Sequence, residues 1–296
     1  MNKWISTELK ELKELNSILK LNNKVYAKIE NTNPSGSIKD RAVYYMLNDY
    51  RLKGLLKKGT TVIEATSGNT GISLSYFSKE FEIDVIIVMP KSMSKERREM
   101  ISHYGAKLVL VDGGMKESKE EALRINRTIK DSIILNQFNN QANIVAHYET
   151  TAEELDNQLE NIDYIFSGIG TGGTISGISK FFKEKNKNIK NIKIIGIEPE
   201  ESPLITKGFA SSHKIQGIGA NFIPPILRLD LIDDVTTVKS EDAIKYSKLI
   251  REKEMLDIGI SSGAALVGAI NYLKNKNIKN KNIVVIFPDK GDRYSW

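Results

Sequence analysis

The fold is decided by the stretch TVIEATSGNTGISLSYFSKE, which occupies residues 61–80. Its first five residues, Thr61–Ala65, form a short, mainly apolar run, which predicts a buried strand. A cluster of small polar residues follows, and apolar residues then recur at helical spacing over Thr70–Glu80. A strand joined to a helix by so short a polar junction is typical of α/β folds with parallel strands.

The alternation of strand and helix continues along the chain. Short apolar runs recur, and the segments between them carry apolar residues at helical spacing. Further strands are predicted at Asp84–Met89, Lys107–Val111, Ile133–Asn136, Tyr164–Phe166, Ile192–Ile197 and Ile283–Phe287. Further helices are predicted at Ile38–Leu56, Lys95–Tyr104, Lys116–Ile129, Thr150–Leu159, Ile175–Lys183, Glu241–Glu254 and Gly263–Lys274. The pattern predicts an α/β protein with open, mostly parallel twisted sheets flanked by helices.

The length of the chain indicates more than one domain. At 296 residues it is about twice the usual domain size, which predicts two domains sharing one ligand cleft. Hydrophobic residues make up 40% and charged residues 27%, which is ordinary for a globular protein. The first 20 residues carry charges throughout, and no apolar run reaches membrane-spanning length. We therefore expect a cytoplasmic protein that does not enter a membrane.

Composition argues against several kinds of chemistry. The chain contains no cysteine, so it has no disulfide, thiol nucleophile or thiolate metal site. Its three histidines, His103, His147 and His213, lie far apart without metal-ligand spacing, so we expect no metal and assign them no catalytic role. The net charge is +6, and the densest basic runs, 183–193 and 274–281, contain no aromatic residue. Such runs are typical of solvated loops and not of a nucleic-acid-binding face.

The polar cluster TSGNTG at residues 66–71 lies where the predicted strand meets its helix. At a helix N-terminus several backbone N–H groups point at one spot, which suits a carboxylate. A well-capped helix without any ligand would have a similar sequence. Asn69 is harder to explain as a cap, and this segment alone leaves both interpretations open.

The segment NPSGSIKDR at residues 33–41 places a lysine in an unusual position. Pro34 and Gly36 predict a turn, and Ser37 can cap a helix whose first turn contains Lys39. The positive end of the helix dipole disfavours an ammonium there, which favours the neutral amine that a Schiff base requires. The ordinary alternative is a surface lysine paired with a nearby acid.

The glycine-rich segment GIGTGGTISG at residues 168–177 again separates a predicted strand from a helix. Bare backbone amides can approach a phosphate closely in such a loop, and the helix dipole favours its charge. The segment also satisfies the dinucleotide pattern GxGxxG. Glu198, at the end of the next predicted strand, could then hold a ribose hydroxyl. Both ligands remain open from this loop alone.

Taken together and in order, these segments resemble the cysteine synthase family of fold-type II enzymes that use pyridoxal 5′-phosphate (PLP). The family includes O-acetylserine sulfhydrylase and cystathionine β-synthase. The resemblance runs from about Tyr26 to Tyr294 and rests on NPSGSIKDR, TSGNTGISL, SKERR, NQF followed by HYETTAEEL, GIGTGGTISG, GIGA and GISSGAA. It implies a tryptophan synthase β-like fold, with a larger PLP-phosphate-binding domain at residues 1–35 and 140–296. A smaller, mobile domain at residues 36–139 would carry the substrate-carboxylate loop.

The resemblance also implies roles for individual residues. Lys39 resembles the lysine that forms the internal aldimine with PLP, and Asn69 resembles the residue that hydrogen-bonds the cofactor's ring hydroxyl. The phosphate would be held by Gly170, Thr171, Gly172, Gly173 and Thr174, which favours PLP over a dinucleotide. The substrate would be bound by Thr66, Ser67, Gly68, Thr70, Gln137, Gly217 and Asn221.

Two positions depart from the common family pattern. Lys290 stands where many sulfhydrylases have the serine that partners the pyridine nitrogen, and a charged lysine cannot accept a hydrogen bond. The motif PDKGDRY looks more like the cysteine synthase B branch, where a serine of the GISSG loop takes that role, so Ser261 or Ser262 is expected to do so here. Asn221 stands where the family has glycine. Its amide could position water or a nucleophile, or it could simply occupy a left-handed turn.

The implied reaction replaces the group on the β-carbon of a serine-derived amino acid. Lys39 would remove the α-proton, and loss of the β-substituent would leave an aminoacrylate on PLP. In a cysteine synthase, O-acetyl-L-serine and sulfide give L-cysteine and acetate. The alternative is a cysteine-degrading enzyme that releases sulfide and forms L-serine or lanthionine. The resemblance further implies a homodimer, with serine acetyltransferase as a further candidate partner.

Overall fold

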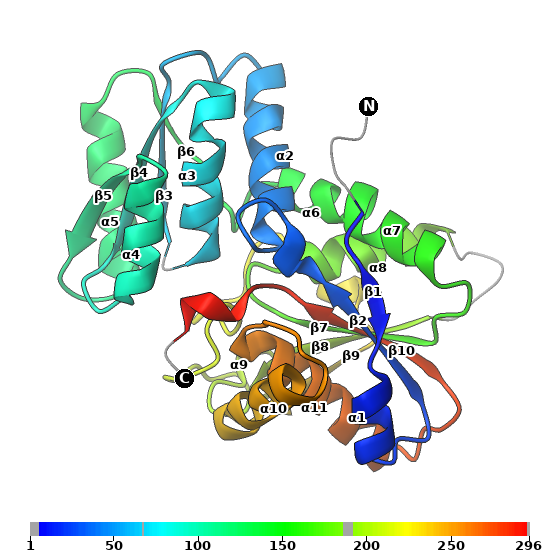
Figure 1. Ribbon diagram of the computed structural model, residues 1–296. Coiled ribbons are helices and arrows are strands. Elements are labelled where there is room, and N and C mark those ends of the chain that lie inside the picture. The colour runs from blue at the N-terminus through cyan, green and yellow to red at the C-terminus, as the bar shows by residue number, and fades with distance from the viewer. Residues whose placement is uncertain (1–5, 67, 186–191, 295–296) are drawn as a thin grey trace. The chain divides into compact units, whose positions relative to one another are not determined.

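The computed structural model describes residues 6–66, 68–185 and 192–294 (Figure 1). The chain divides into two compact units. The first unit comprises Met1–Ile38 and Ile144–Asp292, and the second comprises Lys39–Asn143 and Arg293–Trp296.

The first unit is built on a six-stranded sheet with the strand order β1-β2-β10-β7-β8-β9. The strands are β1 (Leu9–Glu11), β2 (Lys24–Ile29), β7 (Tyr164–Gly168), β8 (Lys193–Pro199), β9 (Asp234–Val238) and β10 (Asn282–Phe287). Only β1 pairs antiparallel, and the other four pairings are parallel. Parallel strands of this kind are buried on both faces, which matches their content of isoleucine, valine and phenylalanine.

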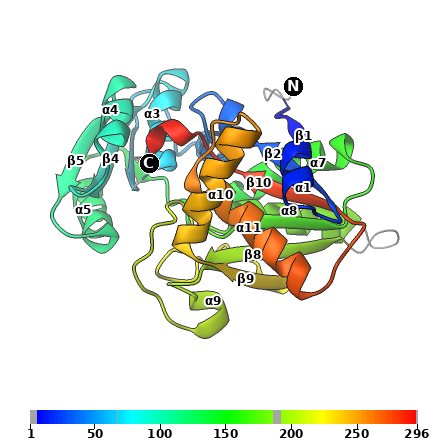
Figure 2. The same cartoon turned by 60° about the horizontal axis from the view of Figure 1, so that its bottom comes forward.

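Helices cover both faces of this sheet. Figures 1 and 2 show α7 and α8 on one face and α10 and α11 on the other. The helices of the unit are α1 (Lys13–Ile18), α6 (Ala142–Ala146, which spans the unit boundary), a π-helix at His147–Ala152, α7 (Glu153–Gln158), α8 (Gly173–Lys185), α9 (Leu204–Lys207), α10 (Ser240–Lys253) and α11 (Ile260–Asn275). Short 3₁₀ segments lie at Glu30–Thr32, Leu229–Leu231 and Gly291–Arg293. Twelve residues of α11 are buried, which makes it the central helix of this unit.

The second unit has a four-stranded parallel sheet with the strand order β5-β4-β3-β6. Its strands are β3 (Thr61–Ala65), β4 (Asp84–Pro90), β5 (Lys107–Val111) and β6 (Ser132–Ile134). Its helices are α2 (Lys39–Leu52), α3 (Asn69–Phe81), α4 (Lys95–His103) and α5 (Met115–Thr128). Ala122 and Ile125 of α5 pack with Ile63 and Ile86 on one face of the sheet.

The structure confirms the predicted fold class. All seven predicted strands are present. The strand and helix predicted within residues 61–80 are β3 and α3. Three strands were missed, namely β1, β2 and β9, because they are short or contain polar residues. The strand predicted at Ile133–Asn136 ends at Ile134, since Asn136 has a left-handed φ of 59°.

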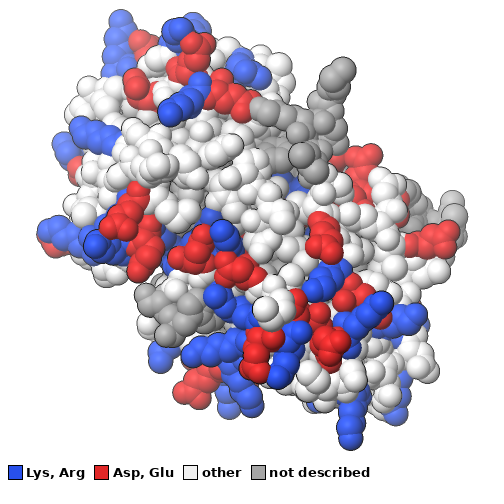
Figure 3. All heavy atoms as spheres, in the orientation of Figure 1, with Lys and Arg blue, Asp and Glu red and all other residues white. Residues whose placement is uncertain are grey.

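Charges of both signs are mixed on the face of the molecule drawn in Figure 3. Lysines of the two predicted basic runs pair with acids, as in Lys183 with Asp233 at 2.8 Å and Lys276 with Asp234 at 3.0 Å. Within the described ranges, each helix is too short or too polar to cross a bilayer.

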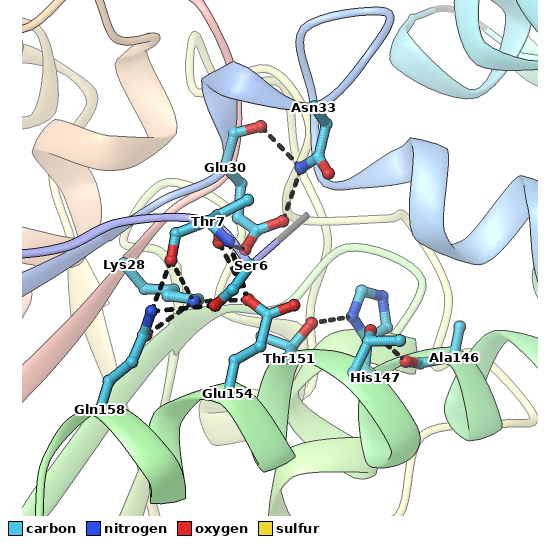
Figure 4. Close-up of polar contacts among 11 residues, drawn as sticks. Ser6, Thr7, Lys28, Glu30, Asn33, Ala146, His147, Thr151, Glu154 and Gln158 are labelled. Carbon is cyan, nitrogen blue, oxygen red and sulfur yellow. Dashed lines mark hydrogen bonds and ion pairs between the residues drawn. The ribbon is translucent and has the colours of Figure 1, made fainter. Parts of the chain in front are cut away.

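A buried polar cluster joins the start of the chain to the first unit (Figure 4). The ammonium of Lys28, a fully buried side chain, donates to the Thr7 carbonyl at 2.8 Å, to Glu154 Oε2 at 2.6 Å and to Gln158 Oε1 at 2.8 Å. The Thr7 hydroxyl donates to Glu30 Oε1 at 2.7 Å. Each buried charge in this cluster has a partner, which offsets the cost of removing it from water.

Candidate cofactor and substrate site

The glycine-rich loop of the first unit runs from the end of β7 to the start of α8. The Ile169 N–H donates to the Ile197 carbonyl at 2.9 Å and anchors the loop to the end of β8. A Cβ on Gly170 would lie 2.3 Å from the Gly217 carbonyl oxygen. Glycine is therefore required at position 170 because the loop backbone packs directly on the turn at Gly217.

The end of this loop presents backbone donors at the N-terminus of α8. Gly172 has a φ of 86°, and a Cβ there would lie 2.9 Å from Leu227 Cβ. The N–H groups of the first turn, which includes Gly173 and Thr174, have no acceptor within the helix. They lie at the positive end of a 13-residue helix, so this turn can bind an anion such as a phosphate.

His147 lies next to the glycine-rich loop at residues 168–174, the predicted phosphate loop. Its ring is buried in the π-helix, with Nδ1 3.0 Å from Thr151 Oγ1 (Figure 4). Its Nε2 lies 3.2 Å from Thr174 Oγ1. His147 was expected to have no catalytic role, since the histidines lack metal-ligand spacing. Its contact with Thr174 joins residues 27 positions apart, so no local pattern in the sequence indicates it. A π-helical turn next to a candidate site is a signal that only the structure supplies.

The second unit contains the predicted carboxylate loop. Thr66 is buried, and its Oγ1 accepts the Gly68 N–H at 3.3 Å, just before α3 begins. The Thr70 hydroxyl donates to Gln137 Oε1 at 2.6 Å. This contact leaves the Gln137 amide nitrogen with its two protons as the donor side of the group. Ser67, which was predicted to bind the same carboxylate, lies outside the described residues.

Asn69, the first residue of α3, is held by an arginine from the end of the chain. Arg293 is buried, and its Nη1 donates to Asn69 Oδ1 at 2.7 Å. Since Oδ1 is the accepting atom, the Asn69 Nδ2 group is directed elsewhere as a donor. Arg97 of α4 is also buried, with its guanidinium carbon 5.3 Å from the Tyr294 ring centroid. Sequence analysis gave no role to either arginine.

Lys39 is the first residue of α2, as the sequence predicts. The chain leading to it is fixed within the first unit, since Ile38 N–H donates to the Pro288 carbonyl at 2.8 Å. The following residue, Asp40, accepts a 2.5 Å hydrogen bond from the Ser73 hydroxyl of α3. The backbone on both sides of Lys39 is therefore held in place.

The two candidate serines lie in the first turn of α11. Ser262 is fully buried, and its Oγ has no hydrogen-bond partner among the described residues. Ser261 is also buried, with an exposed fraction of 4%. The Lys290 ammonium lies 3.4 Å from Asp292 Oδ2.

The turn at residues 217–221 packs against the phosphate loop. Gly219 N–H donates to the Ile169 carbonyl at 2.9 Å, and the φ angles of Gly217 and Gly219 are 92° and 68°. Asn221 is exposed and does not have a positive φ. The explanation of Asn221 by a left-handed turn is therefore wrong, and its amide is available at the surface.

Glu198 cannot serve a dinucleotide as the sequence alternative requires. Its carboxylate is buried and accepts the N–H groups of Ile205 and Thr206, each at 2.9 Å. The Thr206 hydroxyl donates to it as well, at 2.5 Å. Both carboxylate oxygens of Glu198 accept hydrogen bonds from the first turn of α9, so this carboxylate is not available to bind a ribose hydroxyl.

Comparison with known proteins gives the class of the chain. Residues 2–289 match the family described as pyridoxal-phosphate dependent enzyme. The cysteine synthase of Buchnera aphidicola subsp. Schizaphis graminum is 46% identical over 283 residues, covering 92% of this chain and 88% of that protein. Cysteine synthase B of Campylobacter jejuni is 45% identical over 273 residues, covering 91% and 89%. A hydrogen sulfide-producing enzyme from Fusobacterium nucleatum has a similar crystal structure, with a TM-score of 0.92 at 38% identity, covering 98% of this chain and 96% of that one.

The chain therefore belongs to the PLP-dependent enzymes. Within them it is a member of the cysteine synthase family. The residues present fit this cofactor. The N-terminus of α8 suits its phosphate, and an asparagine amide held by Arg293 suits its ring hydroxyl. The family confirms PLP as the cofactor predicted from the sequence.

Proposed function

We propose that this protein is a cysteine synthase, which converts O-acetyl-L-serine and sulfide into L-cysteine and acetate. The observation that carries the proposal is the hydrogen bond between Thr70 and Gln137, which joins a helix N-terminus to a side-chain amide. Together these groups suit the carboxylate that every amino-acid substrate carries. The substrate-binding set would be Thr66, Ser67, Gly68, Thr70, Gln137, Gly217 and Asn221.

The residues proposed to bind PLP come from the glycine-rich loop and from the first turns of α3 and α11. The loop Gly170–Thr174 would hold the phosphate, Asn69 Nδ2 would donate to the ring hydroxyl, and Ser261 or Ser262 would partner the pyridine nitrogen. When bound, PLP supplies an electron sink for the bonds broken at the α- and β-carbons. In this proposal the smaller domain carries the carboxylate loop and the larger domain carries the phosphate loop.

Lys39 has two tasks in the proposed reaction. Its amine would hold the cofactor as a Schiff base in the resting enzyme. Once displaced by the incoming amino acid, it would take the proton from the α-carbon. With the cofactor serving as electron sink, acetate would leave the β-carbon and sulfide would take its place there.

A second candidate reaction starts from cysteine and releases sulfide. The similarity to the hydrogen sulfide-producing enzyme of Fusobacterium nucleatum supports it. The exposed amide of Asn221 supports it too, since it could orient water or a second nucleophile. The products would be L-serine or lanthionine.

The test is to supply the purified PLP-loaded enzyme with two substrate sets. O-acetyl-L-serine with sulfide should give cysteine, and cysteine alone should give little sulfide. The Lys39→Ala variant is the control and should lose at least about a hundredfold in turnover, since its general base is gone. Rapid sulfide release from cysteine, with slow cysteine formation, would instead establish the second candidate.

The proposal extends to assembly and location. We expect a homodimer in the cytoplasm, with serine acetyltransferase as a candidate partner. Light scattering of the purified enzyme, alone and mixed with a serine acetyltransferase, tests both interactions.

A further inference from the structure

A buried glutamate lies between the carboxylate loop and Gln137. Glu64 is in β3, two residues before Thr66, and its side chain is only 3% exposed. β3 pairs with β6, its neighbour in Figure 1, and the last ladder bond joins Leu135 N–H to the Ile63 carbonyl at 3.1 Å. Beyond this bond the chain following β6 leaves the sheet.

The Glu64 carboxylate accepts hydrogen bonds from the chain at that exit. Asn136 N–H donates to Oε2 at 2.9 Å, and Gln137 N–H approaches Oε1 at 3.4 Å. Asn136 has a φ of 59°, a left-handed conformation that asparagine adopts more readily than most residues and that turns the chain at this point. Both carboxylate oxygens therefore stabilise the turn that presents Gln137.

The Gln137 side chain and carbonyl are fixed on their other sides. Thr70 donates to the side-chain oxygen at 2.6 Å, and Asn143 Nδ2 donates to the backbone carbonyl at 2.9 Å. The Gln137 amide also lowers the Glu64 pKa by a side-chain hydrogen bond. Glu64 therefore contacts both the backbone and the side-chain amide of Gln137, while the Thr70 hydroxyl donates to the oxygen of that amide.

We propose that Glu64 is a positioning residue that holds Gln137 for the substrate carboxylate, and that it does so fully only when ionised. The inference rests on the proposed function, because it assigns Gln137 to the substrate carboxylate. Glu64 itself does not touch the substrate. It acts through the Asn136–Gln137 turn.

The charge of Glu64 is expected to change near neutral pH. Burial raises its pKa to about 7, although the hydrogen bonds from Asn136 and Gln137 and the charge of Lys119 lower it. Two titratable groups face it, Lys119 from α5 and Tyr50 from α2. The Lys119 pKa is itself lowered by burial, and the Tyr50 hydroxyl donates to the carbonyls of Ile134 and Leu135 at 3.2 Å.

The sign of the pH effect follows from the number of acceptors. Above pH 7 both oxygens of Glu64 are free of protons and accept the two N–H groups. Below pH 7 one oxygen carries a proton and no longer accepts well. The turn then loses a hydrogen bond, so the substrate carboxylate should bind less tightly as the pH falls through 7.

The test compares Glu64→Gln with the wild-type holoenzyme between pH 6 and 8.5. Wild-type KM for O-acetyl-L-serine should rise as the pH falls through 7, with kcat changing less. In Glu64→Gln the KM should be raised about tenfold at high pH, the effect of one lost hydrogen bond, and should not follow that titration. Amide hydrogen exchange at Asn136 and Gln137 should be faster in the variant. Wild-type KM, pH profile and exchange rates in Glu64→Gln would overturn the proposal.

Glu198→Gln is a matched control. Glu198 is also buried and also accepts two backbone N–H groups, but they belong to α9 in the first unit. This variant should keep the wild-type KM and its pH dependence. If Glu64→Gln does not fold, Glu64→Asp, which keeps the charge but shortens the reach, should show a raised KM that still titrates. A normal KM in the aspartate variant would contradict the proposal.

The two proposals can fail separately. If the wild type turns over neither O-acetyl-L-serine nor cysteine, the proposed function is wrong, and hydrogen exchange alone then decides whether Glu64 holds the turn. If exchange accelerates in Glu64→Gln but KM for an active substrate does not change, Gln137 is not the carboxylate ligand, and the inference is wrong.

Discussion

The proposed phosphate loop and the proposed carboxylate loop are similar in local structure but are held in shape by different interactions. Each is a run of small residues at the N-terminus of a helix, α8 in one case and α3 in the other. The phosphate loop is shaped by close backbone packing, because Gly170 and Gly172 have no room for a side chain. The carboxylate loop is shaped by side chains, namely Thr70, Gln137 and Glu64.

The groups behind the two loops differ in the same way. His147 stands behind the phosphate loop through Thr174. Behind the carboxylate loop lie a buried carboxyl group, Glu64, and a buried guanidinium, Arg293. The first loop should therefore be sensitive to added volume, whereas the second should be sensitive to pH and to loss of single polar groups.

The largest effect is expected for Gly172→Asp. A left-handed φ of 86° costs a non-glycine residue about 1–2 kcal/mol, and the new carboxylate would repel a dianionic phosphate. PLP retention after dialysis should fall about a hundredfold or more. Gly172→Ala is the control for shape alone and should lose less. Equal PLP content in Gly172→Asp and wild type would contradict the assignment of this loop to the phosphate.

The next effect concerns the pH dependence of stability. The pKa of Glu64 is raised from 4.5 to about 7 in the folded protein, so the folded state binds a proton more tightly than the unfolded chain. As the pH rises from 4.5 to 7, ionisation of Glu64 should therefore lower the free energy of unfolding by about 3 kcal/mol. Urea unfolding of wild type and Glu64→Gln at pH 5 and 8 measures this difference. Parallel pH curves for the two proteins would show that Glu64 does not titrate in this range.

The smallest effect is expected for His147→Ala. It removes the hydrogen-bond partner of Thr174 without touching the loop backbone, a loss of about 1 kcal/mol. PLP retention should weaken about fivefold, measured by equilibrium dialysis. The KM for O-acetyl-L-serine should change little, because the carboxylate loop is unaffected. A large change in KM together with normal PLP retention would place His147 in the substrate site.

How much could be predicted from the sequence depends on how far apart in the chain the interacting residues lie. β3 and α3 were predicted well, because the spacing of apolar residues is a property of neighbouring residues. The contact of Arg293 with Asn69 joins residues 224 positions apart, and no local pattern encodes it. β2 was missed because Lys28 makes the segment look polar. Its ammonium can be buried only because it pairs with Glu154 and Gln158, which lie far along the chain. Glu64 was counted as part of an ordinary strand for the same reason.

The cluster around Lys28 has a practical meaning for shortening or redesigning the chain. One of the oxygens that receives the Lys28 ammonium is the main-chain carbonyl of Thr7, an atom that no side-chain substitution can remove. Proteolytic trimming past Thr7 would remove this acceptor and leave the buried ammonium with only Glu154 and Gln158, at a cost of about 1.5–3 kcal/mol. The amino-terminal segment is thus an integral part of the first unit, and trimmed variants for crystallisation should begin before Thr7.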